Sequence, residues 1–220
     1  NTIMNTDNSF TKLLKENGFN IGGWVQGGAT YNPSQVHGFN GPVTFSDQAN
    51  RFQLNQLNFF IERGVRTEGK GWDLGFRADF MFGTDAIFTQ AYGNPAFDVN
   101  NGRPLADRGN WDLDICCSSS RTYGIAIPQA FAEVYAPLGN GLNVKVGHFY
   151  TPIGYETVPA PNNFFYSHAY TMQYGEPFTH TGVLGNYKIT KNFTAMLGTI
   201  GGSGTGGWDG NFDKQMENWG

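Results

Sequence analysis

The chain has 220 residues, a formal net charge of −4, 31 glycines and an aromatic content of 15%. It contains no apolar run approaching the ~20 residues of a transmembrane helix, which excludes such a helix. Its acidic balance excludes a nucleic-acid-binding protein. Few charged residues, together with many glycines and aromatics, favour an all-β protein rich in turns.

Residues 1–19 form an N-terminal segment with one short predicted helix. This helix runs from Asp7 to Asn17, with Asn8 or Ser9 as its cap. We interpret it as a plug or cap at the entrance of a barrel. The first strand is predicted after it, from Ile21 to Tyr31, and a long loop follows.

The most regular stretch is a predicted hairpin from Leu54 to Phe82, with its turn at Thr67–Gly71. Its second strand alternates with period 2 over 11 residues, as a strand with two different faces does. The apolar face carries Trp72, Leu74, Phe76, Ala78, Phe80 and Phe82, and the polar face carries Asp73, Gly75, Arg77, Asp79 and Met81. The first strand repeats the pattern, with Leu57, Phe59 and Ile61 on its apolar face. Either a two-sheet sandwich or a membrane barrel can present such faces.

The pattern of connections distinguishes these two folds. Four more strands are predicted, at Pro128–Leu138, Leu142–Tyr150, Phe178–Ile189 and Phe193–Gly201. The connections between all the predicted strands are alternately long and short. Outer-membrane barrels have short periplasmic turns and longer extracellular loops, and strands of about 9–11 residues cross the bilayer at a tilt. The alternation therefore favours an antiparallel transmembrane β-barrel.

One segment carries a family resemblance. Residues 142–156, LNVKVGHFYTPIGYE, resemble the V-x-V-G-x-F-x-T-P-x-G strand and loop entry of porin-type outer-membrane proteins. With the flanking residues 129–141 and 158–190, the segment is similar to the type 2, OmpL-like family of outer-membrane β-barrel porins. The resemblance implies a single-chain barrel in the lipid of a bacterial outer membrane. It also implies passive diffusion of small hydrophilic solutes, and porins commonly form homotrimers.

Seven predicted strands are an odd number for such a protein. Bacterial single-chain barrels have even strand numbers, and an unpaired edge is very costly in lipid. We therefore expect residues 20–220 to be the N-terminal portion of a longer barrel.

Pore-lining residues are predicted on the polar strand faces, where charges of both signs would cross a narrow lumen and set ion preference. They are Glu62, Arg66, Asp73, Arg77, Asp79, Glu133 and Lys145. The alternative is that these charges merely satisfy one another.

The long connection Thr151–Pro177 is dense in aromatic residues and contains four prolines. This composition is too apolar for a loop that extends into water, so we expect it to fold into the barrel as a constriction. The predicted constriction residues are Tyr155, Glu156, Phe164, Phe165, Tyr166, Tyr170 and Tyr174. The alternative is an external loop packed on its neighbours or on another subunit.

No pattern in the chain indicates an enzyme, a cofactor or a metal site. The four histidines, His37, His148, His168 and His180, lack the tight spacing of metal ligands. Ser167-His168 occurs without a nucleophile-elbow motif. The adjacent Cys116 and Cys117 give no disulfide framework.

Two functions other than a channel remain open. A carbohydrate-binding β-sandwich would use tryptophans as stacking platforms and would bury Leu57, Phe59, Phe76 and Phe80 between two sheets. A plugged barrel would act as a structural scaffold in a larger outer-membrane assembly, with the same fold as a porin but no conductance.

Overall fold

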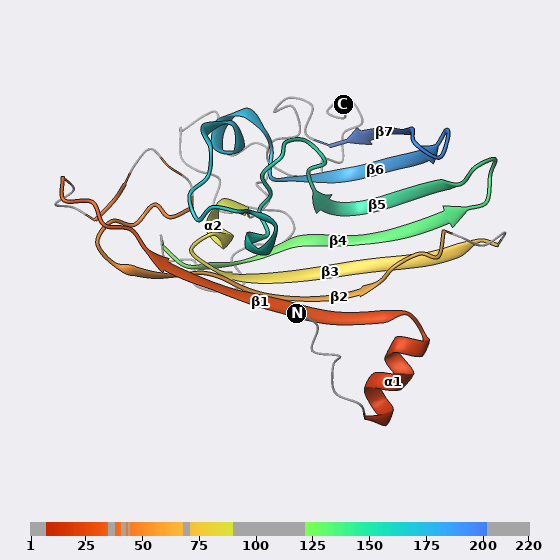
Figure 1. Ribbon diagram of the computed structural model, residues 1–220, viewed down its shortest axis with the longest axis horizontal. Helices are drawn as coiled ribbons and strands as arrows, with labels where there is room; N and C mark the ends of the chain where they lie inside the picture. The colour runs from red at the N-terminus through yellow and green to blue at the C-terminus, as the bar shows by residue number, and fades with distance from the viewer. Residues whose placement is uncertain are drawn as a thin grey trace, which may run out of the picture.

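The computed structural model describes residues 8–34, 38–40, 43, 45–67, 71–89 and 122–201. These residues form one seven-stranded antiparallel sheet in which each strand pairs with its neighbours in the chain (Figure 1). The strands are β1 (Phe19–Ala29), β2 (Phe52–Arg63), β3 (Asp73–Gly83), β4 (Gly124–Ala136), β5 (Leu142–Tyr150), β6 (Thr179–Lys188) and β7 (Thr194–Ile200). The predicted all-β antiparallel fold is confirmed, and the bounds of β5 are those expected from the sequence.

The connections alternate in length as predicted, and the two kinds lie at opposite ends of the sheet. In Figure 1 the turns after β2, β4 and β6 lie at the right, and the long connections after β1, β3 and β5 start at the left. The turn after β6 is closed by the Thr190 hydroxyl, which accepts hydrogen bonds from the backbone N–H groups of Asn192 and Phe193.

Four short helices accompany the sheet in the part of the chain that the structure describes. Helix α1 (Ser9–Glu16) begins at the predicted cap Asn8, which forms a capping box with Thr11, and it lies beside β1 at the short-turn end (Figure 1). The others belong to long connections: α2 (Ala86–Thr89), the 3₁₀ turn η2 (Ala160–Asn162) and the π-turn η3 (Thr171–Gly175). Among the described residues, no helix has the length and apolarity that crossing a membrane requires.

The exposure of side chains on the two faces of the sheet rejects the alternative of a two-sheet sandwich. Leu57, Phe59 and Phe80 are 47%, 44% and 46% exposed, while Asp79 and Gln56 are completely buried. Phe76 is only partly buried. No second sheet covers the apolar face within the described ranges. The expectation that these four apolar side chains pack between two sheets is therefore wrong.

The buried apolar cluster of the described chain lies at the long-connection end, and we call it the loop core. It consists of Phe45, Met81, Ala86, Ala126, Val158 and Met172. Two of its members come from the ends of β3 and β4, and the rest come from the long connections and α2. Phe88, Tyr150 and Phe178 pack against it.

Two glycines of the V-x-V-G-x-F-x-T-P-x-G motif have backbone conformations that other residues rarely adopt. Gly147 has φ +133° and Gly154 has φ +93°. A Cβ atom on Gly147 would collide with the backbone of Ala130 in β4, and one on Gly154 would collide with the carboxylate of Glu176. The motif therefore fits the close strand pairing at Gly147 and the compact loop entry at Gly154.

Candidate functional site

A cluster of paired charges occupies the polar face of β2, β3 and β4. Arg77 Nη1 lies 2.7 Å from Glu62 Oε2, and its Nε and Nη2 lie 2.6 Å and 3.0 Å from the two carboxylate oxygens of Asp79. The Arg77 guanidinium also lies 4.4 Å from the ring centroid of Phe60. Gln129 Nε2 donates to Asp79 Oδ1 over 3.4 Å. Three of the predicted pore-lining residues are thus brought into one network.

Two further predicted residues meet across β4 and β5. Glu133 and Lys145 are register partners. Lys145 Nζ lies 4.3 Å from the ring centroid of Phe131, and Asn143 Nδ2 donates to Glu133 Oε1 over 2.8 Å. Lys145 therefore lies over the ring of Phe131, and Glu133 is hydrogen-bonded to the amide of Asn143, on neighbouring strands of the sheet.

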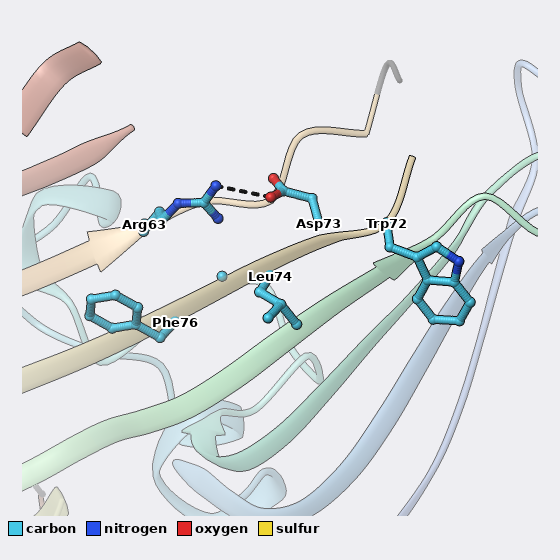
Figure 2. Close-up of a pocket in the computed structure, with 6 residues that line it drawn as sticks. Arg63, Trp72, Asp73, Leu74 and Phe76 are labelled. Carbon is cyan, nitrogen blue, oxygen red and sulfur yellow. Dashed lines mark hydrogen bonds and ion pairs between the residues drawn. The ribbon is translucent and has the colours of Figure 1, made fainter. Parts of the chain in front are cut away.

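The last two predicted pore-lining residues lie apart, at the short-turn end. Asp73 forms an ion pair with Arg63 over 2.9 Å and accepts a hydrogen bond from the backbone N–H of Arg66 over 2.7 Å. Figure 2 shows the carboxylate of Asp73 directed toward Arg63, and the side chain of Leu74 on the other side of β3. Asp73 therefore fastens the hairpin, four residues along β3 from Arg77.

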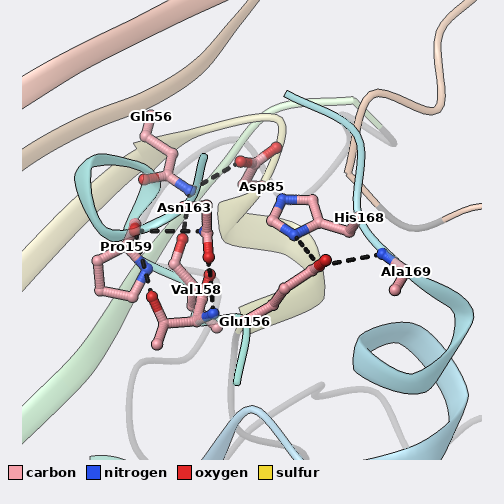
Figure 3. A network of polar contacts seen from close by, with 9 residues as sticks. Gln56, Asp85, Glu156, Val158, Pro159, Asn163, His168 and Ala169 are labelled. Atoms are coloured by element: carbon pink, nitrogen blue, oxygen red, sulfur yellow. Dashed lines mark hydrogen bonds and ion pairs between the residues drawn. The ribbon is translucent and has the colours of Figure 1, made fainter. Parts of the chain in front are cut away.

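The connection between β5 and β6 is fixed to the polar face of the sheet by Gln56 of β2. Gln56 Oε1 accepts from Trp24 Nε1 over 2.8 Å and from the backbone N–H of Ala160 over 3.0 Å. Gln56 Nε2 donates to Asp85 Oδ2 over 2.9 Å and to the carbonyl of Val158 over 2.8 Å (Figure 3). These bonds use both donors and both lone pairs of the amide. Gln56 therefore clamps η2 against the polar face of the sheet. We call the sheet β1 to β7 the wall and its polar face the inner wall.

A second contact between the same loop and wall involves Asn55. Tyr166 Oη donates to Asn55 Oδ1 over 3.0 Å, and Asn55 Nδ2 contacts both Thr84 Oγ1 and Asp85 Oδ1 over 3.3 Å. Burial raises the pKa of Asp85, and hydrogen bonds from Gln56, Asn55 and Thr84 partly oppose that rise. A buried carboxylate is thus part of the clamp.

Polar contacts also fold the loop on itself. Glu156 Oε2 lies 3.1 Å from His168 Nδ1 and accepts from the backbone N–H of Ala169 over 3.0 Å (Figure 3). Asn163 accepts from the backbone N–H of Thr157 over 2.9 Å and donates back to the Thr157 carbonyl. Burial and the nearby Glu156 carboxylate raise the pKa of Glu176.

The aromatic residues of the predicted constriction lie mostly at the surface of the described chain. Tyr155 and Phe164 are 98% and 91% exposed, and Phe165, Tyr170 and Tyr174 are also exposed. Only Tyr166 is partly buried. Apart from Tyr166, the loop contacts the wall through Val158–Asn162, by backbone groups and prolines.

Between η2 and the wall lies a cavity of about 350 Å³. Pro159, Pro161 and Asn162 line it from the loop, and the residues that line it from the wall are Gly23, Trp24, Phe60, Arg77, Gln129 and Tyr150. Each of the strands β1 to β5 supplies at least one of these wall residues.

The sequence patterns missed Gln56 and Tyr150 as site residues, and they indicated Trp24 only as one of the tryptophans that the alternative sandwich would use as stacking platforms. A signal for Gln56 was present, because the polar pair Asn55-Gln56 breaks the alternation of β2. No local pattern identifies Trp24 or Tyr150, since their neighbours in the cavity come from other strands and from the loop.

Some predicted features lie outside the described residues, namely Cys116, Cys117, His37 and the middle of the turn at 67–71. Within the described ranges, no three His, Cys, Asp or Glu side chains gather closely enough to hold a metal ion.

Comparison with known proteins gives one match. The model of a family described as "putative beta-barrel porin-2, OmpL-like" matches residues 18–220. The search of curated proteins and the search of solved structures each gave no match.

Proposed function

Because the chain belongs to the OmpL-like β-barrel porin-2 family, we propose that it forms an outer-membrane channel for passive diffusion of small hydrophilic solutes or ions. In this proposal the polar face of the sheet lines water and the apolar face contacts lipid. The clamped loop narrows the lumen at η2, beside the Arg77 cluster. Closure of the barrel requires that the outer edges of β1 and β7 are also paired, because an unpaired edge is very costly in lipid.

The observation that carries the proposal is the inverted distribution of polar and apolar side chains. Leu57, Phe59 and Phe80 project from the sheet without cover from the described residues, whereas Glu62, Arg77 and Asp79 form ion pairs on the opposite face. Soluble monomers rarely expose contiguous apolar patches larger than a few hundred Å². Lipid is a solvent in which such a face is stable, and the paired charges then face the lumen.

The test is ion conductance of the full chain, refolded in detergent and reconstituted in a planar lipid bilayer. Wild-type protein should give stepwise, ohmic openings. Lys145→Gln removes a positive charge beside the Arg77 cluster, so the permeability ratio of cation to anion should rise by about two- to fivefold, as loss of a unit charge near the ion path implies.

Lys191→Gln is the matched control, because Lys191 is exposed in the short turn between β6 and β7. It removes the same charge and should leave the permeability ratio unchanged. Folded, membrane-inserted protein without conductance would reject the channel.

The same experiment tests a second candidate, a plugged barrel that serves as a scaffold. The observation that favours it is the clamp itself, because Gln56 holds η2 across the inner face with four hydrogen bonds. A scaffold predicts no conductance from the wild type. It also predicts that openings appear when the clamp is removed.

A further inference from the structure

We propose that the cavity between η2 and the inner wall binds an uncharged sugar ring as it passes through the channel. This inference rests on the proposed channel function, because the cavity opens on the face that would line the lumen. It adds a solute class to that function and names the residues that recognise the solute.

The size and lining of the cavity suit one small ring. Its volume of about 350 Å³ is at the lower end of ligand pockets, which span roughly 300–1,000 Å³. Trp24, Phe60, Pro159 and Pro161 give it apolar surfaces from the wall and from the loop. The hydrogen bond from Trp24 Nε1 to Gln56 fixes the indole in place, so the aromatic surface is preorganised.

The cavity also has polar groups without partners. Tyr150 lines it, and the Tyr150 hydroxyl oxygen is buried without a hydrogen-bond partner among the described residues. A buried hydroxyl in that state is costly unless a water or a ligand pairs with it. Across the cavity, Asn162 is exposed, and no described residue hydrogen-bonds its side-chain amide. A ligand with several hydroxyl groups could pair with both.

Arg77 adds donors to the cavity while its charge is already compensated. Three of its nitrogen atoms contact the carboxylates of Glu62 and Asp79. A guanidinium has five N–H groups, so two remain for a neutral acceptor. An anion would meet the carboxylates of Glu62 and Asp79 close to the guanidinium, and a cation would meet the guanidinium itself. The arrangement therefore favours an uncharged ligand.

These features together describe a ligand with one apolar face and a rim of hydroxyl groups. A pyranose ring has this character, because its C–H groups can lie on an indole or proline surface while its hydroxyls reach Tyr150, Asn162 and Arg77. A purely apolar solute would leave the Tyr150 hydroxyl unpaired. An ion without a ring would not pack on the aromatic surface of Trp24 and Phe60.

The test uses D-glucose as the probe, with glucuronate and glucosamine as its charged relatives, because both keep the pyranose ring. Glucose should reduce the ion current through the reconstituted channel in a saturable way. Each charged relative should need an about tenfold higher concentration for the same reduction of the current. Tyr150→Phe and Asn162→Ala should each weaken the block by about three- to tenfold, which is the range expected for one lost hydrogen bond. Tyr31→Phe is the matched control, because Tyr31 is 83% exposed and outside the cavity, and it should have no effect.

Isothermal titration calorimetry, with glucose added to the detergent-solubilised chain, measures binding at the same site and does not depend on an ion current. Absence of conductance with glucose bound would reject the channel and keep the sugar site. An open channel with no saturable block and no heat of binding would reject the sugar site and keep the channel. Equal binding of glucuronate, or a Tyr150→Phe variant that binds glucose like the wild type, would also overturn the inference.

Discussion

The strand wall and the loop core of this protein place their apolar side chains in opposite ways. The wall, β1 to β7, keeps apolar side chains such as Phe59 on its open face and paired charges on the other. The loop core buries apolar side chains such as Phe45 and Val158 together, as a small soluble domain does. The loop core can therefore be stable in water, whereas the wall needs an apolar solvent on one side.

The two regions are joined by amides and by a buried carboxylate. Gln56 and Asn55 belong to the wall, Asp85 precedes α2, and the bonds from Gln56 reach Val158 in the loop core. Buried polar groups of this kind are stabilising only when all are satisfied. The junction is thus the point at which one change should separate the two regions.

The largest effect is expected from Gln56→Leu. It removes four hydrogen bonds and leaves Trp24 Nε1, the Val158 carbonyl and the Ala160 N–H without that partner. We expect the free energy of unfolding in detergent to fall by roughly 3 kcal/mol or more, because each buried group left unsatisfied costs about 1–3 kcal/mol. Single-channel conductance should rise as η2 leaves the wall.

Gln26→Leu is the control for this change. Gln26 of β1 is the register partner of Gln56, and none of the hydrogen bonds of the clamp involves it. Thermal unfolding and conductance of the two variants should differ clearly. If they match, the clamp does not hold the loop.

A smaller effect on stability is expected when exposed phenylalanines are replaced by arginine, and it should differ between two such residues. Phe59 lies on the open face of the wall, and Phe164 lies in the loop and is 91% exposed. In a bilayer, Phe59→Arg should cost about 2–4 kcal/mol, as expected for Arg on the lipid face of a barrel, whereas Phe164→Arg should change stability by less than about 0.5 kcal/mol. Urea-dependent folding into vesicles measures both. Equal values would mean that the open face of the wall does not contact lipid.

The wall could be predicted from the sequence because its information is local. Alternation with period 2 assigns Arg77 and Asp79 to one face and Phe80 to the other, and the lengths of the connections give the topology. The structure moves most strand ends by only a few residues. The same local pattern does not show that Trp24 and Tyr150 line the cavity, because the other lining residues come from other strands and from the loop.

The loop core and the clamp could not be predicted in the same way. Gln56 contacts the backbone of Val158 and Ala160, about a hundred residues later in the chain, and no periodicity encodes such a contact. Aromatic content indicated that the loop would pack, but Tyr155 and Phe164 are exposed, and of the predicted aromatic residues only Tyr166 hydrogen-bonds to the wall. The other contacts come from the stretch that includes Pro159. A loop held by backbone groups leaves little trace in side-chain composition.

The smallest expected effect concerns the pH dependence of the junction. Burial raises the pKa of Asp85 in the folded protein, so the folded state binds its proton more tightly than the unfolded state does. The stability that follows from this is fully present below the unfolded pKa of the carboxyl, and it is lost as pH rises through the folded pKa. The unfolding free energy of the wild type minus that of Asp85→Asn should therefore fall as pH is raised from mildly acidic to neutral values.

Thermal unfolding at several pH values measures this difference, and Glu16→Gln is the control because Glu16 is exposed at the end of α1. Its difference from the wild type should stay flat over the same range. A difference for Asp85→Asn that rose with pH would mean that the hydrogen bonds from Gln56, Asn55 and Thr84 outweigh burial. The carboxylate form would then be the one that holds the wall and the loop core together.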